Sequence, residues 1–154
     1  MNKFMLKAIE LASIGATNTK GGPFGAVIVK NNEIVGQGYN QVTSTCDPTA
    51  HAEIVAIRDA CKKLNTFHLE NCEIYTNCEP CPMCLGAIYW AHIRKIYYAV
   101  SRYDAAKIGF DDAFIYEEFA KDLGQRQYPL TQVIVPQALK PFEIWYTMEN
   151  KINY

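Results

Sequence analysis

Three cysteines stand at an even spacing of three residues in the stretch TNCEPCPMCLG, residues 76–86: Cys78, Cys81 and Cys84. Thiolates bind zinc, and a tetrahedral zinc site takes four ligands, one of which is water when the site is catalytic. Cys81 and Cys84 begin a predicted helix, so both side chains lie on one face of its first turn. The amino end of a helix also stabilises the thiolate form. This pair is therefore predicted to supply two metal ligands.

A third ligand is expected from His51, which begins another predicted helix behind the turn CDPTA. Glu53 follows two residues later, about 200° further around the helix axis. Both side chains can face one site only if that site lies at the end of the helix. We therefore expect a metal between two helix amino ends, whose N–H groups favour anionic ligands. The other histidines, His68 and His92, are interpreted as partly exposed structural residues at the ends of elements.

The two halves of this arrangement read TAHAE and PCPMC, and together they match the H-x-E…P-C-x-x-C signature of zinc deaminases. Each half alone is weak evidence, because C-x-x-C also occurs in redox pairs. The signature predicts a zinc-bound hydroxide as nucleophile and Glu53 as proton shuttle. The alternative is a structural zinc module with Cys78 as fourth ligand. That closed site would leave no position for water, so we place Cys78 in the wall of the site.

The elements that must position these residues alternate along the chain. Hydrophobic periodicity and turn residues predict strands at 24–29, 34–39, 72–76, 94–100 and 130–136, and helices at 1–17, 47–64, 81–91, 109–122 and 137–152. This order predicts one α/β domain, residues 1–154, built as a three-layer α/β/α sandwich around a central mixed five-stranded sheet. The opening hairpin should be antiparallel, and strands separated by helices should run parallel.

Two of these helices have distinct hydrophobic patterns. In the helix at 47–64, Ile54, Ile57, Cys61 and Leu64 recur on one face. The helix at 81–91 is apolar nearly all round, so we expect it to be buried.

Composition narrows the function classes. The 154 residues carry a formal net charge of −1 without a run of like charge, which argues against a large basic surface for nucleic acid or anionic lipid. No apolar stretch approaches the length of a membrane span, and the N-terminus lacks a secretory signal. The six cysteines are therefore interpreted as reduced thiols or metal ligands, and the expected compartment is the cytoplasm.

With these motifs in place, the chain resembles the cytidine-deaminase-like superfamily of zinc hydrolases, and within it the small bacterial guanine deaminases. The resemblance spans essentially the whole chain and is carried by GGPFGAVIVK, DPTAHAEI, CEPCPMCLGAIYWA, GFDDAFIY and the terminal aromatic after ENKIN. It implies that His51, Cys81 and Cys84 bind one Zn²⁺ per subunit. It also implies hydrolytic deamination of guanine to xanthine and ammonia.

Geometry alone suggests that N–H groups near Ala50 and Cys81, at the helix amino ends, stabilise the tetrahedral intermediate. The resemblance further implies a set of residues that contact or surround the purine: Asn40, Phe24, Trp90, Asp112 and Tyr154. Three of them have plain structural alternatives. Asn40 ends a hairpin, where Asn is common, Asp112 could cap a helix, and a terminal Tyr154 is often frayed. Chemistry favours a substrate contact for Asp112, since guanine carries an N1–H donor that a carboxylate can accept.

The same resemblance implies a homodimer in which the C-terminal helix and tail, about residues 136–154, are exchanged between subunits so that Tyr154 reaches the partner's active site. The rival interpretation is a tRNA adenosine deaminase, which shares the zinc motif but should carry a C-terminal helix rich in Lys and Arg. Here residues 136–154 hold two Lys, two Glu and no Arg. We therefore expect a free nucleobase as substrate and no nucleic-acid partner.

Overall fold

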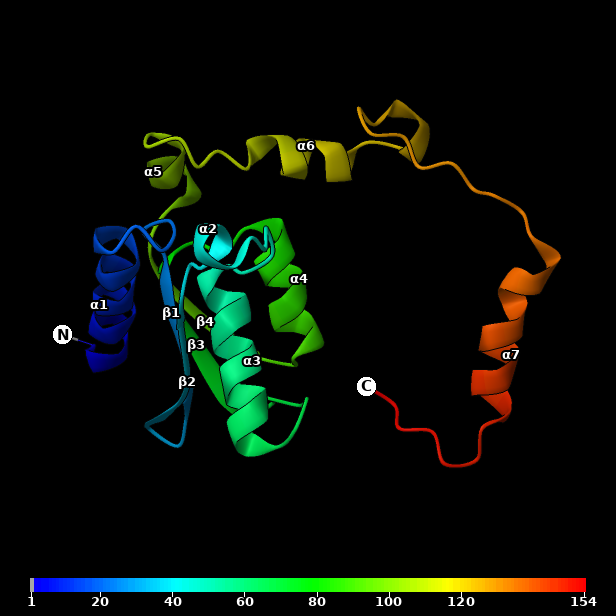
Figure 1. The fold of residues 1–154 in the computed structure, drawn as a ribbon, viewed down its shortest axis with the longest axis horizontal. Coiled ribbons are helices and arrows are strands. Elements are labelled where there is room, and N and C mark those ends of the chain that lie inside the picture. The colour runs from blue at the N-terminus through cyan, green and yellow to red at the C-terminus, as the bar shows by residue number, and fades with distance from the viewer. Residues whose placement is uncertain (1) are drawn as a thin grey trace. The chain divides into compact units, whose positions relative to one another are not determined.

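The computed structural model describes residues 2–154, which form two compact units divided after Ala113. The elements of the first unit are α1 (Lys3–Thr17), β1 (Gly25–Lys30), β2 (Glu33–Tyr39), α2 (Val42–Thr45), α3 (Ala52–Leu64), β3 (Cys72–Cys78), α4 (Pro82–Trp90), β4 (Lys95–Val100) and α5 (Arg102–Ala106) (Figure 1). The elements that follow are α6 (Ala113–Ala120), the 3₁₀ turns η1 (Leu123–Gln125) and η2 (Pro136–Leu139), and α7 (Lys140–Thr147). Within residues 2–154, no helix is long and apolar enough to span a membrane.

The first unit is built on a mixed sheet with the strand order β2-β1-β3-β4. β1 runs antiparallel to both of its neighbours, and β3 runs parallel to β4. The strands separated by helices, β2, β3 and β4, therefore run the same way, as predicted. The hairpin strand β1 is inserted between β2 and β3, so the carboxyl end of β3 lies beside the amino end of β1.

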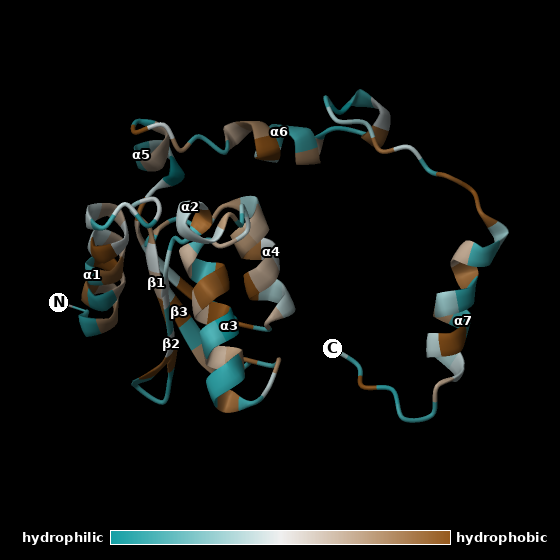
Figure 2. Ribbon diagram, viewed as in Figure 1, coloured by the Kyte–Doolittle hydropathy of each residue, from teal (hydrophilic) through white to brown (hydrophobic). Residues whose placement is uncertain are grey.

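The prediction of a fifth strand at 130–136 is wrong: the sheet has four strands. Residues 130–135 are extended but belong to no strand, and Val133 and Ile134 are 76% and 86% exposed. Figure 2 shows apolar residues in this extended segment before α7. A run of β-branched residues becomes a strand only when a neighbour accepts its backbone hydrogen bonds, and within the described chain no strand pairs with this run.

Three layers form because β1 buries both of its faces. Ala26 and Ile28 belong to the core cluster on the side of α3 and α4, whereas Val27 and Val29 pack with Phe4 of α1 on the opposite side. Figure 1 shows α1 on one face of the sheet and α3 and α4 on the other. The alternation of side chains along a strand accounts for this division. It confirms the predicted α/β/α layering and mixed sheet within the first unit.

Helix α3 packs on the core through small residues as well as large ones. Ala52, Ala56 and Ala60, four positions apart, are fully buried, and Ile57, Cys61 and Leu64 are partly buried against the same core cluster. The alanines meet two glycines of β2. A Cβ added to Gly38 would lie 2.6 Å from the Ala52 carbonyl oxygen, and one added to Gly36 would lie 2.5 Å from that of Ala56. Small residues on both sides let this helix backbone approach the strand.

The expectation that the helix beginning near Cys81 is buried holds for only one of its faces. Cys84 and Ile88 of α4 are fully buried, but Tyr89 and Trp90 are largely exposed. A helix buries only the faces that neighbouring elements cover. The face of α4 toward the sheet is covered, and its apolar outer face is accessible in the single chain.

Candidate functional site

The amino ends of α3 and α4 carry the residues with metal-binding chemistry. His51 is the N-cap residue of α3 and Cys81 is the N-cap residue of α4, each with extended backbone. Neither side chain caps its own helix, so each can face outward from the helix end. Pro82 at the first turn of α4 needs no N–H partner there and fixes the direction in which this helix starts. Two helix amino ends thus converge on one point.

The geometry of these side chains fits a tetrahedral zinc ion. Nδ1 of His51 lies 3.6 Å from Sγ of Cys81 and 3.5 Å from Sγ of Cys84, and the three ligand atoms lie within 4.8 Å of one another. Zinc bonds of about 2.3 Å to sulfur and about 2.05 Å to nitrogen, at a tetrahedral angle, place these atoms about 3.6 Å apart. One neutral imidazole and two sulfurs leave a fourth position for water.

The electrostatics of the pair also favour a cation. Hydrogen bonds from Cys84 and then His51 lower the pKa of Cys81 to about 4, so this residue is a thiolate. The pKa of Cys84 is raised by its hydrogen bond to that thiolate and by burial, so Cys84 keeps the shared proton. A divalent metal can replace this proton and stabilise both thiolates, because a coordinated thiol is deprotonated.

Glu53 is buried beside these ligands, with a side chain only 6% exposed in the first turn of α3. Burial is the main cause that raises the pKa of this carboxyl, and the negative charge of Cys81 adds to it. A raised pKa suits a group that accepts a proton in one step and returns it in another. The helix end thus lets a metal ligand and a buried acid, two positions apart, face the same site.

Cys78 ends β3 and lies in the wall of the adjoining cleft rather than in the ligand cluster. Its thiol donates to the carbonyl oxygen of Ser101 at 3.8 Å. Burial and the charge of Glu53 raise the pKa of Cys78 to about 11, which keeps it protonated. Its chemistry is that of a buried neutral thiol.

A cleft of about 640 Å³ adjoins the ligand cluster, and its lining includes His51, Glu53 and Cys81. Phe24 and Phe110 form one apolar wall, with ring centroids 4.9 Å apart in an edge-to-face arrangement. This is a suitable size and polarity for a flat heterocycle. Sequence reasoning selected Phe24 and missed Phe110, although Phe110 lies within the quoted motif GFDDAFIY.

Asn40 lines the same cleft and is buried. Its side-chain oxygen accepts hydrogen bonds from the backbone N–H groups of Gly22 and Val42, at 3.1 and 3.2 Å. These bonds fix the amide plane and leave its NH₂ group to donate to a ligand. Asn40 therefore does more than end a hairpin, because its side chain joins two loops at the rim of the cleft.

The two aspartates before α6 have different roles. Asp111 accepts a hydrogen bond from the N–H of Ala113 at 2.9 Å, which makes it the residue that caps the helix start. Both aspartates line the cleft, and at Asp112 burial followed by the negative charge of Cys81 raises the pKa of the carboxyl. The capping role considered for Asp112 is therefore carried out by Asp111.

Three residues expected near the substrate are not among those lining this cleft. Ala50 is buried just before His51, and its N–H already donates to the Asp47 carbonyl. Trp90 is 70% exposed and ends α4, whereas the cysteine ligands lie at the first turn. Tyr154 belongs to the second unit and is 75% exposed.

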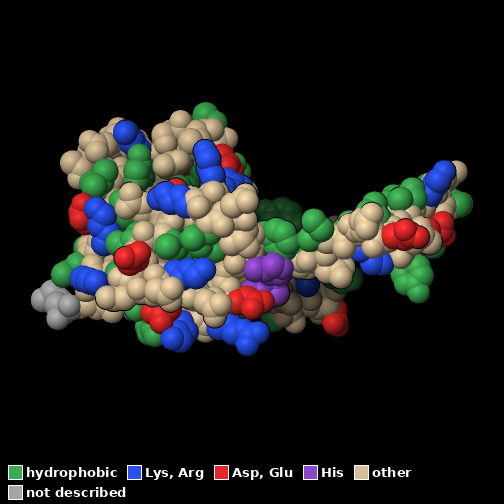
Figure 3. All heavy atoms as spheres, turned by 90° about the horizontal axis from the view of Figure 1, so that it is seen from below, with side chains coloured by type: hydrophobic (Ala, Val, Ile, Leu, Met, Phe, Trp, Pro, Cys, Tyr) green, Lys and Arg blue, Asp and Glu red, His purple; other side chains and the backbone are tan. Residues whose placement is uncertain are grey.

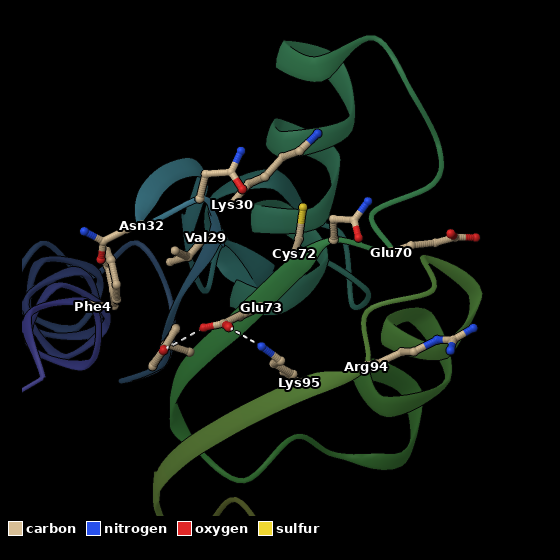
Figure 4. Close-up of a pocket in the computed structure, with 12 residues that line it drawn as sticks. Phe4, Val29, Lys30, Asn32, Glu70, Cys72, Glu73, Arg94 and Lys95 are labelled. Atoms are coloured by element: carbon tan, nitrogen blue, oxygen red, sulfur yellow. Dashed lines mark hydrogen bonds and ion pairs between the residues drawn. The ribbon is translucent and has the colours of Figure 1, made fainter.

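A larger hollow of about 880 Å³ lies at the opposite end of the strands, near Lys30 and Cys72 (Figure 4). Its most central acid, Glu73, accepts hydrogen bonds from Tyr75 and Lys95, both at 2.9 Å. These partners lower the pKa of Glu73 and hold it as a paired carboxylate. The hollow contains neither the ligand cluster nor a buried proton-transfer group, so the smaller cleft is the candidate active site.

Comparison with known proteins agrees with this geometry. Residues 1–100 match the model of the cytidine and deoxycytidylate deaminase zinc-binding region. The chain is 51% identical to a guanine deaminase of Bacillus subtilis, over 98% of this chain and 97% of the relative. A crystal structure of guanine deaminase from Bacillus subtilis superimposes with a TM-score of 0.96, covering 100% of this chain and 99% of that one.

More distant similarities reach other members of the group. A tRNA-specific adenosine deaminase of Aquifex aeolicus is 48% identical, over 50% of this chain and 51% of its own. A structure in complex with 2,6-diaminopurine has a TM-score of 0.66 at 34% identity, covering 71% of this chain and 61% of that one. The full-length match, the family model and the convergent His51, Cys81 and Cys84 lead to one conclusion: this chain belongs to the cytidine and deoxycytidylate deaminase family of zinc-binding proteins.

Proposed function

We propose that this protein is a zinc-dependent guanine deaminase that hydrolyses guanine to xanthine and ammonia. The observation that carries the proposal is the convergence of His51 Nδ1 on both cysteine sulfurs, with the buried acid Glu53 beside them. The substrate follows from the guanine deaminase relative, which matches nearly the whole chain, whereas the tRNA deaminase relative matches half of it. The solved relative that binds 2,6-diaminopurine supports a purine in the cleft.

His51, Cys81 and Cys84 would hold one zinc per subunit. When bound there, zinc lowers the pKa of a coordinated water and so supplies a nucleophile near neutral pH. Glu53 would take one proton from the attacking water and pass it to a ring nitrogen, and would then carry the second proton of that water to the departing amine. The amine leaves as ammonia, and the oxygen of the water becomes the new carbonyl of xanthine. Burial of Glu53 excludes solvent that would otherwise exchange these protons.

Three residues of the cleft are proposed to orient guanine. The apolar ring of Phe24, held edge-to-face by Phe110, would lie against the purine. The NH₂ of Asn40 can donate to a purine acceptor, because its oxygen is already occupied by Gly22 and Val42. Asp112 can accept the N1–H of guanine, whereas adenine has only a lone pair at that position. Trp90 and Tyr154 remain proposed contacts that rest on the family resemblance, and Ala50 remains one that rests on its place at the amino end of α3.

The experiment that tests this function compares Glu53→Gln with wild type in an ammonia-release assay. Glu53→Gln should keep its zinc and lose about 10²–10⁴-fold in rate on guanine, the usual contribution of a general acid–base group. The matched control is Glu73→Gln, which changes an acid at the other end of the sheet. Adenine and a tRNA anticodon stem-loop serve as alternative substrates. Faster release from either one than from guanine would reject the substrate assignment.

We also propose that the protein is a homodimer with exchanged C-terminal segments. Strand β4 forms the edge of the sheet and exposes Tyr98 and Val100, while residues 130–135 expose Val133 and Ile134 without a strand partner. An uncovered strand edge and an unpaired apolar run are complementary, and pairing between two copies would satisfy both. In such a dimer, residues 136–154 would carry Tyr154 to the partner's cleft.

Mixing two inactive variants tests this exchange directly. Glu53→Gln and a chain lacking Tyr154 are each expected to form dimers by light scattering and to release little ammonia. After co-refolding of equal amounts, about half of the dimers are heterodimers. Each heterodimer has one site with both defects and one intact site, so about a quarter of all sites recover activity. No recovery in verified heterodimers would mean that Tyr154 does not act across the dimer.

The proposed working compartment is the cytoplasm. All six cysteines are free thiols, including the ligands Cys81 and Cys84. Thiols at this density persist where the environment is reducing. Fractionation of expressing cells, with guanine deamination measured in each fraction, checks this assignment.

A further inference from the structure

A second cluster of metal-binding side chains follows the carboxyl ends of α3 and α4. His68, Glu70 and His92 each offer one ligand atom, and these atoms lie within 4.8 Å of one another. The rings of His68 and His92 have centroids 4.7 Å apart. Figure 3 shows histidine side chains gathered at the surface next to an acidic one. Glu70 also belongs to the lining of the hollow near Lys30 and Cys72.

The backbone holds this cluster in place. The N–H of Leu69 donates to the carbonyl of Ala91 at 2.9 Å, which sets His68 beside His92. Leu69 itself is fully buried in the core cluster of the α3–α4 side. The two histidines are therefore neighbours because the main chain places them so, and their separation is fixed by packed structure.

His92 breaks a local rule at its position. It follows the end of α4 with φ +60°, and its N–H and that of Ile93 donate back to Tyr89 and Ile88. This helix ending favours Gly or Asn, since other side chains are strained with positive φ. The end of α3 obeys the rule with Asn65 at φ +50°. The two helix-ending hydrogen bonds hold His92 in this conformation and so fix the position from which its ring extends.

An unpaired ring atom of His68 gives independent evidence for a ligand at this cluster. Its Nδ1 is buried and has no hydrogen-bond partner among the described residues. Its main-chain N–H and carbonyl are engaged with the Thr66 hydroxyl, which leaves Nδ1 as the unsatisfied atom. A buried polar atom without a partner is destabilising, and a ligand that pairs with it removes this penalty.

We propose that His68, Glu70 and His92 form a second site for a divalent first-row transition ion, specifically zinc, separate from the centre at His51. Two imidazoles and one carboxylate are a known donor set for zinc that leaves the fourth position to water. Ligand atoms on zinc lie about 3.3 Å apart, so these side chains must close slightly by rotation. The ion would tie the segment leading into β3 to the end of α4. It would thus fix the far ends of the two helices whose amino ends hold the other ligands.

Metal stoichiometry of the zinc-loaded protein tests this site, independently of its activity. Wild type dialysed against buffered free zinc should hold a second equivalent per chain by mass spectrometry of the metal. At free zinc 100 times its Kd, Tm should rise by about 5–11 °C. His92→Gly removes one ligand and suits the positive φ. It should therefore hold one zinc, keep a Tm at or above that of wild type in low zinc, and show no response to added zinc.

His68→Ala should likewise lose the second equivalent, whereas Glu33→Gln, an exposed acid outside the cluster, should keep it. A wild-type chain that never exceeds one zinc, or a second equivalent that persists in both histidine variants, overturns the proposal. The deamination rate with guanine should be unchanged in His92→Gly, which separates this site from the centre at His51.

Discussion

Replacing Gly38 by Ala should move the catalytic helix and thereby reduce both stability and activity. The added Cβ would lie 2.6 Å from the carbonyl oxygen of Ala52 and 2.8 Å from the backbone nitrogen of Ala56. Ordinary Cβ contacts begin near 3.4 Å, so the backbone of α3 must retreat by roughly 0.8 Å. Backbone cannot rotate aside as a long side chain can. The displacement falls on the first turn of α3, which carries His51 and Glu53.

The expected magnitude follows from overpacking a close contact. Such insertions cost about 1–3 kcal/mol, which for a chain of this length lowers Tm by about 2–12 °C. A displacement of about 1 Å in a reacting group can reduce the rate about 10²-fold. We therefore expect Gly38→Ala to lower Tm, zinc occupancy and the rate of ammonia release together. Differential scanning calorimetry, metal analysis and the guanine assay measure these three quantities.

Two further glycines provide controls. Gly36→Ala brings a Cβ to 2.5 Å from the Ala56 carbonyl, one turn further from His51. This variant should lose as much stability as Gly38→Ala but less of its activity. Gly86→Ala adds a Cβ on α4 with nothing within 4 Å and should stabilise the helix by about 1 kcal/mol. If Gly38→Ala kept the wild-type Tm and rate, the close approach would not be what positions α3.

Other parts of the site give shorter predictions. Asn77 accepts a hydrogen bond from the N–H of Gly25 at 2.8 Å and donates one to the Pro23 carbonyl at 3.0 Å. Asn77→Ala should therefore lower the free energy of unfolding, measured with urea, by about 1–3 kcal/mol. It should also raise KM for guanine, because Phe24 lies between the two bonded residues. Asp112→Asn should slow guanine deamination while metal analysis finds normal zinc; a wild-type rate would remove Asp112 from substrate recognition. Chelation of zinc should abolish ammonia release and lower Tm, and re-addition of zinc should restore both. A thiol titration checks that the cysteines have stayed reduced between the two steps.

Part of the architecture could be predicted because local periodicity and packing agree. In α1, Phe4, Ala8, Leu11 and Gly15 repeat at helical spacing, and the structure buries all four. The four strands of the sheet were also predicted near their observed positions, because runs of β-branched residues between turns have few other stable conformations. Such patterns are local, and they depend little on which element lies next to them.

The contact between α3 and β2 was not predictable in the same way. The hydrophobic periodicity of α3 comes from large residues such as Ile57 and Leu64, whereas the structure places Ala52 and Ala56 against β2. Small residues carry little hydrophobic signal, and their role appears only when a glycine on another element faces them. The same limit explains the missing fifth strand, since a strand needs a partner that sequence pattern does not specify.

The sequence by itself was enough to predict the chemistry: the positions of His51, Glu53, Cys81 and Cys84 are those expected at two helix amino ends, and their donor atoms suit zinc. Tertiary structure decided which other side chains share that site. It placed Asp111 and Asp112 in the cleft, with Asp111 also bonded to the start of α6, and it left Trp90 at the far end of α4. It also brought His68 and His92 together through one hydrogen bond between Leu69 and Ala91. The physical reason is that ligand type and helix-end geometry are properties of short segments, whereas proximity between distant residues depends on how the whole chain packs.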